Sequence, residues 1–196
     1  MSDLEKRLGA IQAKITSEEF LTGRRLGGDI PYWIFDYPPA DELRVRDHVD
    51  RLLRRLSGDA SPVSPCHVDL LDLVKTMLEG RRLLDKAIEM QRTKGDAAVS
   101  RALAAEMDPE RIAEAFVKSV TIETCSFVLV TGVGASYPLV RTHNLMNALH
   151  SRTGHVPIVF FYPGRYDGQY LRLFDTMPES AYYRAFRLIS DSEGSR

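Results

Sequence analysis

The residues that could do chemistry begin in a glycine-rich turn after an apolar run. Phe127–Val130 leads into Thr131-Gly-Val-Gly-Ala-Ser-Tyr-Pro138, and a helical pattern follows. A phosphate loop needs Gly-x4-Gly-Lys-Ser/Thr, because backbone amides surround the phosphates and the lysine neutralises their charge. Gly132 and Gly134 are present, but no lysine follows them and the nearest cation is Arg141. The turn is therefore predicted to be a tight strand-to-helix connection, with a phosphate site as the alternative.

Motifs for nucleophilic or metal chemistry are incomplete near this turn. Ser136 lies in Gly-Ala-Ser-Tyr-Pro, whereas a nucleophile elbow needs Gly-x-Ser-x-Gly. His143, Asn147 and His150 share one face of the following helix, but no carboxylate joins them there. We expect a polar or partner-facing stripe on that helix. The sequence predicts no catalytic residue, no metal site and no cofactor.

A second polar group follows the next predicted strand, in Phe160-Phe-Tyr-Pro-Gly-Arg-Tyr-Asp-Gly-Gln-Tyr170. The carboxyl ends of parallel strands meet at one sheet edge, so this group should lie beside the glycine turn. Arginine and tyrosine often anchor protein interfaces. The alternative is an ordered loop in which Arg165 pairs with Asp167. The predicted partner- or ligand-binding rim consists of Asp36, Gly132, Gly134, Tyr137, Arg141, His143, Arg165, Tyr166, Asp167 and Tyr170.

The elements that position this rim alternate between strand and helix, which predicts βαβ units and a mainly parallel sheet with helices on both faces. Predicted strands are Ile30–Tyr37, Cys66–Leu71, Phe127–Thr131 and Pro157–Tyr162, with further candidates at Leu171–Phe174 and Tyr183–Ile189. Predicted helices are Ser2–Ile15, a short turn after Ser17, Asp41–Leu56, Val74–Thr93, Ala97–Glu106, Pro109–Val120 and Leu139–Ser151.

Length and composition predict one α/β domain spanning residues 1–196, with a helical insertion at 74–120. The net charge of −1 gives no support to nucleic-acid binding by the surface of the protein as a whole. The basic clusters at 51–55 and 81–82 are expected to be solvated helix faces, with direct DNA contact as an open alternative. Cys66 and Cys125 lack a metal-binding spacing, and the start of the chain lacks the apolar region of a signal peptide. We expect a cytoplasmic protein with reduced thiols and no membrane association.

Several ordered motifs resemble the BrxB family, a small component of the BREX bacteriophage-exclusion systems. They are Thr131-Gly-Val-Gly-Ala-x-Tyr-Pro-Leu-x-Arg-x-His143, Phe161-Tyr-Pro-Gly-x-Tyr-Asp-Gly-Gln169, Leu171–Phe174 and Tyr182–Phe186. The resemblance covers nearly the whole chain. It implies a three-layer α/β fold like that of P-loop NTPases but without a Walker A motif, in agreement with the missing lysine.

The resemblance also implies a working context. The chain would act in a defence island that encodes a PglZ-type alkaline-phosphatase-like protein, an AAA+ ATPase and a DNA methyltransferase. We expect a non-catalytic adaptor that binds the PglZ-type protein, with the ATPase and the methyltransferase as further possible partners. The alternative is a degenerate nucleotide-binding sensor or weak NTPase within the same complex.

Overall fold

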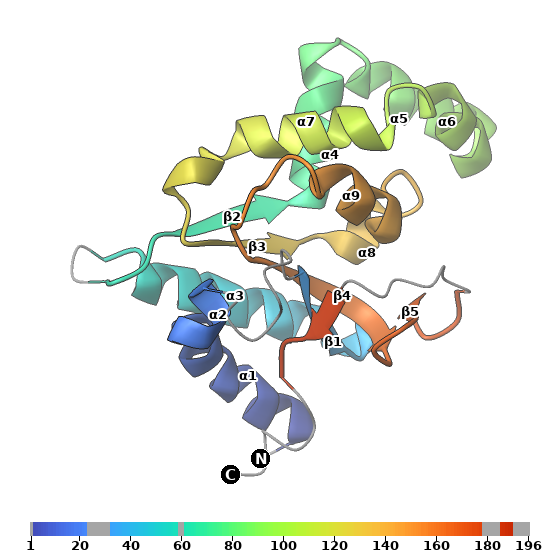
Figure 1. Ribbon diagram of the computed structural model, residues 1–196. Helices are drawn as coiled ribbons and strands as arrows, with labels where there is room; N and C mark the ends of the chain where they lie inside the picture. Colours follow the sequence, from blue (N-terminus) through green and yellow to red (C-terminus); the bar gives the residue numbers. More distant parts are fainter. Residues whose placement is uncertain (1, 23–31, 59–60, 178–184, 190–196) are drawn as a thin grey trace.

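The computed structural model describes residues 2–22, 32–58, 61–177 and 185–189. Its centre is a six-stranded sheet in which five strands follow the order β2-β3-β4-β1-β6 and pair in parallel, while β5 pairs with β4 in the antiparallel direction. The strands are β1 Tyr32–Tyr37, β2 Pro65–Asp69, β3 Phe127–Thr131, β4 Ile158–Tyr166, β5 Leu171–Leu173 and β6 Ala185–Arg187. Helices cover both faces of the sheet (Figure 1), so the predicted layered α/β architecture with a mainly parallel sheet is confirmed.

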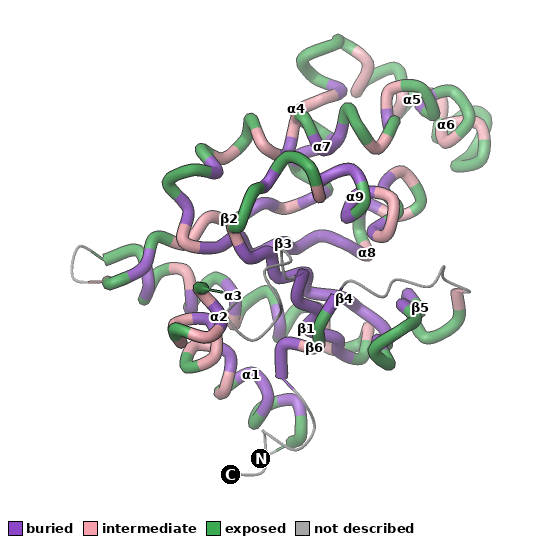
Figure 2. The backbone as a smooth tube through the Cα atoms, viewed as in Figure 1, coloured by how far each residue is buried: buried purple, intermediate pink, exposed green. Residues whose placement is uncertain are grey.

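The central strands are apolar nearly throughout because both of their faces are covered. Along β1, Tyr32 and Ile34 point into one core, whereas Trp33 and Phe35 point into the other. This alternation follows from the two-residue period of a strand. Two separate hydrophobic cores result, one on each side of the sheet. Figure 2 shows buried residues along the strands and in helices of both layers.

One face is covered by α1 Asp3–Ile15, α2 Glu18–Thr22 and α3 Glu42–Leu56. The first helix begins at a capping box, in which the Ser2 hydroxyl accepts from the amide of Glu5 and the Glu5 carboxylate accepts from the amide of Ser2. A 3-10 turn, Pro39–Asp41, precedes α3. The predicted helices in this layer are confirmed, and the predicted strand residues Ile30 and Pro31 lie outside the described residues.

The opposite face is covered mainly by helices that connect β2 to β3 and β3 to β4 (Figure 1). They are α4 Leu70–Gly80, α5 Leu84–Lys94, α6 Asp96–Leu103, α7 Pro109–Ser119, α8 Val133–Ser136 and α9 Thr142–Leu149. The prediction of one helix over Val74–Thr93 is wrong, because the chain turns at Arg82, whose φ of 58° is incompatible with a helix. The helix predicted from Leu139 begins three residues later, after the cis peptide bond between Tyr137 and Pro138.

The fourth strand is longer than predicted. It continues through Pro163 and Gly164 to Tyr166 and then pairs with β5 as a hairpin. Gly164 is needed at this point because its φ is 153° and an added Cβ would lie 2.2 Å from the carbonyl oxygen of Arg172. The hairpin returns residues 171–175 to the carboxyl-terminal edge of the sheet.

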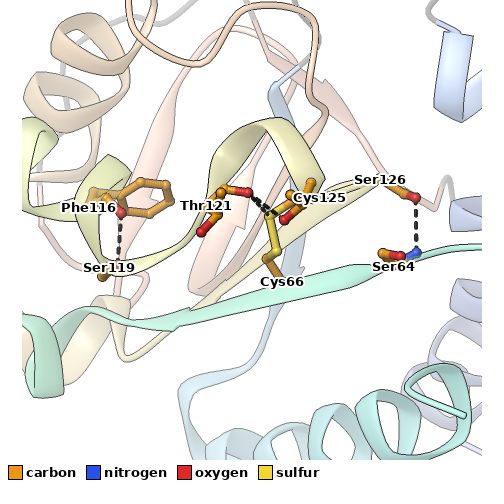
Figure 3. The surroundings of a disulfide bond; sticks show 8 residues. Ser64, Cys66, Phe116, Ser119, Thr121, Cys125 and Ser126 are labelled. Atoms are coloured by element: carbon orange, nitrogen blue, oxygen red, sulfur yellow. Dashed lines mark hydrogen bonds between the residues drawn. A yellow bond between two sulfur atoms is a disulfide. The ribbon is translucent and has the colours of Figure 1, made fainter.

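A disulfide joins Cys66 at the start of β2 to Cys125 just before β3, with 5.6 Å between the Cα atoms (Figure 3). The prediction of reduced thiols is therefore wrong in this structure. Parallel pairing of β2 with β3 brings the two residues together although 59 positions separate them in the sequence. Beside the disulfide, Ser126 donates its amide to the Ser64 carbonyl at 2.8 Å, and Ser64 donates its amide to the Ser126 hydroxyl at 2.9 Å.

Candidate functional site

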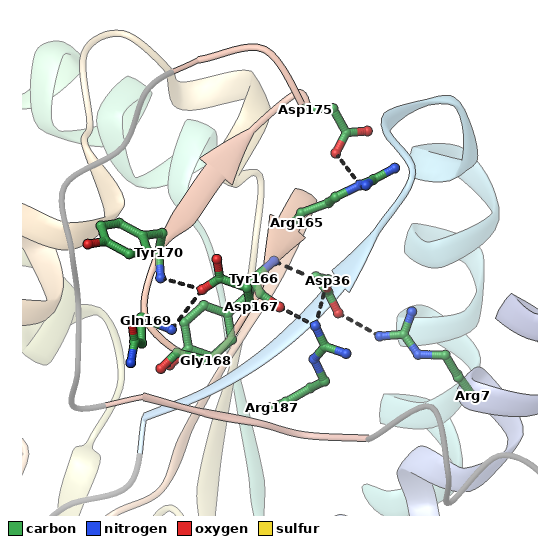
Figure 4. Close-up of polar contacts among 10 residues, drawn as sticks. All are labelled: Arg7, Asp36, Arg165, Tyr166, Asp167, Gly168, Gln169, Tyr170, Asp175 and Arg187. Atoms are coloured by element: carbon green, nitrogen blue, oxygen red, sulfur yellow. Dashed lines mark hydrogen bonds and ion pairs between the residues drawn. The ribbon is translucent and has the colours of Figure 1, made fainter.

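Asp36 near the end of β1 is buried in a network of cations rather than exposed on a rim (Figure 4). Its Oδ1 accepts from Arg7 Nη2 at 2.6 Å, and its Oδ2 accepts from the amide of Tyr166 at 3.1 Å. Arg187 Nη2 lies 3.7 Å from the same Oδ2, and the Arg7 guanidinium stacks 4.9 Å above the Phe35 ring. Asp36 therefore ties α1, β4 and β6 to β1, and no free carboxylate oxygen faces a ligand.

Tyr166 is also buried, in contrast to the prediction of a surface anchor. Its hydroxyl donates to the carbonyl oxygens of Ala185 and Gly168, which lie 2.6 Å and 3.0 Å away. Burial, followed by the nearby Asp167 charge, raises the pKa of Tyr166 to about 12. The physical reason for the correction is the length of β4, because a residue in a paired strand can point into the core. Tyr166 and Asp36 are thus removed from the surface that a partner could contact.

The glycine turn lies at the end of β3 and is packed against a carboxylate. Gly132 has a φ of 72°, and a Cβ built there would lie 2.5 Å from Asp69 Oδ1. Asp69 ends β2, accepts from the amides of Leu71 and Asp72, and so caps α4. A negative side chain therefore occupies the space beside Gly132, on the strand next to β3.

Asp69 belongs to a hydrogen-bonded chain that the sequence prediction missed. Thr131 Oγ1 donates to Asp69 Oδ2 at 3.0 Å, and His67 Nε2 lies 2.8 Å from the same hydroxyl. The Thr131 hydroxyl has one proton, which it gives to the Asp69 carboxylate. The hydroxyl can therefore only accept from His67, so Nε2 carries the proton of the neutral imidazole and Nδ1 is the ring's acceptor. Burial lowers the pKa of His67, and the Asp69 charge opposes this effect. The available signal was the two-residue spacing of His67 and Asp69, which places both on one face of a strand.

The other side of the glycine turn is closed by the hairpin. A Cβ at Gly134 would lie 2.9 Å from Phe174 Cε1 and from Pro163 Cγ. The Phe174 ring also meets Tyr137 edge-on, with 6.4 Å between the ring centroids. Phe174 and Asp175 both have positive φ, 53° and 62°, which costs energy for residues with a side chain. The hairpin thus holds an aromatic pair over the turn.

Three of the predicted rim residues on the hairpin are exposed. Arg165 forms an ion pair with Asp175 at 3.1 Å, so the alternative in which it pairs with Asp167 is wrong. The Asp167 carboxylate instead accepts from the amides of Tyr170 and Gln169, and these bonds lower its pKa. Tyr170 is 47% exposed. Arg165, Asp167 and Tyr170 therefore remain available to a partner.

The remaining rim residues lie near the other end of the glycine turn. Arg141 is exposed, and its guanidinium forms no hydrogen bond or ion pair with the described residues. Tyr137 and His143 are half-buried on either side of it. Because β4 lies between β1 and β3, Asp36 is not adjacent to this turn. The structure therefore divides the predicted rim into a buried ionic network, an exposed hairpin and a glycine turn packed by its own neighbours.

Two further predictions concern metals and basic helices. Within the described ranges, no group of three or more His, Cys, Asp or Glu residues is arranged to hold a metal ion. Arg51, Arg54 and Arg55 line a shallow hollow of about 400 Å³ with His48 on α3. None of these three arginines pairs with a described carboxylate, whereas Arg81 pairs with Glu106.

In the part of the chain that the structure describes, no helix has the length and apolar character needed to cross a membrane.

Fold and site define a layered α/β protein with a mainly parallel sheet and a lysine-free glycine turn. Comparison with known proteins identifies the family more closely. The family described as "BREX protein BrxB" matches residues 66–188. A BREX protein BrxB of Escherichia coli O9:H4 (strain HS) is 37% identical over 189 residues, which cover 96% of this chain and 93% of that protein. One of Bacillus cereus (strain H3081.97) is 35% identical over 194 residues, which cover 96% and 99%.

The chain belongs to the BrxB family. No solved structure matches it. The likeness to P-loop NTPases consequently remains a prediction from the sequence resemblance, while the layered parallel architecture is observed directly.

Proposed function

We propose that this chain is a non-catalytic adaptor of a BREX system, that it acts in phage exclusion, and that its partner is a PglZ-type alkaline-phosphatase-like protein. Membership of the BrxB family supports the BREX context, since two relatives of nearly the same length are named as BREX proteins. The adaptor role goes beyond those names and rests on the geometry of the glycine turn and of the hairpin, whereas the choice of a PglZ-type partner rests on what the family resemblance implies.

The observation that carries the adaptor proposal is the packing of the glycine turn. Asp69 occupies the space beside Gly132, and Phe174 with Pro163 occupies the space beside Gly134. A triphosphate there would meet a carboxylate rather than a lysine, and like charges at close range repel. The helix that follows is only four residues long, so few amides are aligned toward the turn. This arrangement favours a structural role for the turn.

The hairpin supplies the chemistry of an interface. The Arg165 side chain is 79% exposed, and Tyr170 and Phe174 are also partly exposed. Arginine and tyrosine contribute strongly at interfaces because they combine apolar area with hydrogen-bonding groups. The antiparallel pairing of β4 with β5 holds this surface on a regular element. A stable complex would bury about 1,600 Å² in total, so the hairpin would form one part of the contact.

The test is co-expression with each BREX component in turn, followed by affinity capture and size-exclusion chromatography. We expect the PglZ-type protein to co-elute with the chain, with the AAA+ ATPase and the methyltransferase as the other arms. The double variant Arg165→Ala, Tyr170→Ala should weaken the complex, while Leu43→Ala, an exposed residue on α3, should leave it unchanged. If the chain elutes alone with every component, the adaptor proposal fails.

The second candidate function is a nucleotide sensor, favoured by one observation. Arg141 follows the glycine turn and has no ion pair among the described residues, so it could neutralise a phosphate. A ligand at 100 times its Kd stabilises a protein by about 2.7 kcal/mol, which thermal shift detects readily. A shift with ATP or GTP and magnesium that disappears in Arg141→Ala would favour the sensor. An unchanged melting temperature would remove it.

A further inference from the structure

Two adjoining hollows lie between the α5–α6 helices and the segment 137–141. The first, of about 320 Å³, is lined mainly by apolar side chains of α4, α5, α6 and residues 135–139. The second, of about 410 Å³, contains Arg141 and Asn144 and borders α6 and α7. Ser100, Pro138 and Leu139 line both. The hollows are therefore adjacent, and together they are called the groove, with an apolar end and a cationic end.

The apolar end contains a helical stripe without a full partner. Leu84, Ala87 and Ile88 of α5 line the groove at positions i, i+3 and i+4, and Gln91 continues the stripe at i+7. No residue of α5 is buried, and Ile88 is 40% exposed. The tube in Figure 2 accordingly shows α5 as exposed and intermediate along its length. Leu71, on the facing wall formed by α4, is 37% exposed. A helix with half-covered apolar positions at this spacing can gain free energy by packing against another helix.

The charges of the groove determine which helix would fit. Asp96, the carboxylate that lines it, accepts from Gln91 Nε2 at 2.9 Å, but glutamine is neutral and does not offset the charge of the carboxylate. Lys75 donates to Asp72 at 2.9 Å and is neutralised by it. Arg141 at the other end has no counter-ion among the described residues. Lys75 and Asp96 thus carry opposite charges at the apolar end, whereas Arg141 is the charged residue that lines the other end. The positive charge without a counter-ion lies at the Arg141 end, and a carboxylate of an occupant complements it there.

We propose that this groove binds an acidic amphipathic helix of a partner protein. The apolar residues of that helix would cover the α5 stripe, and a carboxylate at its edge would pair with Arg141. Helix-in-groove binding of this kind uses anchors at i, i+3, i+4 and i+7, which is the spacing that α5 presents. The inference rests on the proposed adaptor function and names a surface, in addition to the hairpin, through which the adaptor would bind.

The direct test uses a pair of synthetic model helices and the full chain. One fluorescent peptide repeats leucine at i, i+3, i+4 and i+7 with glutamate at flanking positions, and its twin carries lysine in place of glutamate. We expect the acidic peptide to bind with an anisotropy change and the basic twin to bind at least about tenfold more weakly. Equal binding of the two, or no binding of the acidic peptide at millimolar concentration, overturns the proposal.

Variants then locate the site. Ile88→Glu should weaken the acidic peptide about tenfold or more because it places a charge in the apolar end. Arg141→Glu should weaken it about fivefold and improve binding of the basic twin. Leu43→Glu is the matched control, since Leu43 is 74% exposed on α3, on the opposite face of the sheet. Circular dichroism establishes that each variant is folded. If Leu43→Glu weakens binding as much as Ile88→Glu does, the peptide is not held in the groove.

The outcomes separate this inference from the adaptor proposal. If no BREX component co-elutes but the acidic peptide binds in an Ile88-dependent way, the adaptor role fails and the groove stands. If a component co-elutes equally with wild type and Ile88→Glu, and the acidic peptide does not bind, the adaptor role stands and the groove is wrong.

Discussion

The Asp69 carboxylate lies so close to Gly132 that a single added carbon atom would collide with it, at 2.5 Å from Oδ1. This contact links the end of β2 to the turn after β3. Glycine is therefore required at position 132 for two reasons. The Asp69 carboxylate leaves no room for a side chain, and the backbone there is left-handed. The same carboxylate caps α4, so one side chain organises both connections at this edge of the sheet.

Gly132→Ala should destabilise the protein. The left-handed backbone alone costs about 1–2 kcal/mol for a residue with a Cβ, and the contact with Asp69 adds to this. Urea unfolding measures the change. In an Asp69→Ala background the cost of Gly132→Ala should fall, because only the backbone contribution remains. Gly9→Ala is the control, since a Cβ in this helical position meets nothing within 4 Å and should stabilise α1 by about 0.5–1 kcal/mol.

Asp36→Ala should cost about 3–5 kcal/mol, because it leaves the buried Arg7 without its counter-charge. Chemical denaturation followed by fluorescence measures the loss. Arg44→Ala serves as the comparison, since its ion pairs with Glu5 and Asp41 are largely exposed and contribute no more than about 1 kcal/mol. A similar effect of the two variants would contradict the structural role assigned to Asp36.

Reduction of the Cys66–Cys125 disulfide should lower stability by up to about 4 kcal/mol in the loop-closure model, given the 59-residue separation. Thermal unfolding with and without reductant measures this effect. The double variant Cys66→Ser, Cys125→Ser should match the reduced protein and be insensitive to reductant. Mass spectrometry after alkylation of freshly lysed cells would show whether the bond forms in the cell. Reductant that leaves the melting temperature of the wild type unchanged would contradict this prediction.

Mild acid should destabilise the fold through His67. Burial lowers the pKa of His67 below its ordinary value of 6.5, so the unfolded chain takes up a proton more readily. The free energy of unfolding is therefore unaffected by protonation of His67 above pH 6.5, where the imidazole is neutral in both states. It decreases as the pH falls from 6.5 toward the lower pKa that His67 has in the folded state. His48 contributes with the same sign, because burial and then Arg51 and Arg55 lower its pKa. The urea midpoint should depend less on pH across this window in His67→Gln than in the wild type. An equal dependence of the midpoint on pH in the two proteins would contradict the role given to His67.

Local patterns predicted most elements because each depends on neighbouring residues. The bounds of β3 agree with the prediction at both ends, since Phe127–Thr131 is a short apolar run that ends at a glycine. The predicted start of the first helix at Ser2 also agrees, since Ser2 caps α1 in the structure. The rim was predicted less well. Tyr166 reads as part of a loop after Pro163-Gly164, yet pairing with β5 extends the strand through both residues and turns the tyrosine into the core.

Hydrophobic periodicity was enough to predict a parallel α/β sheet, and the residues after Thr131 were enough to predict a glycine turn that lacks the phosphate-loop lysine, because both are properties of consecutive residues. The contact between Asp69 and Gly132, the disulfide and the burial of Asp36 could not be predicted in this way. Each depends on which strands lie side by side, and strand order is set by packing between segments far apart in the chain.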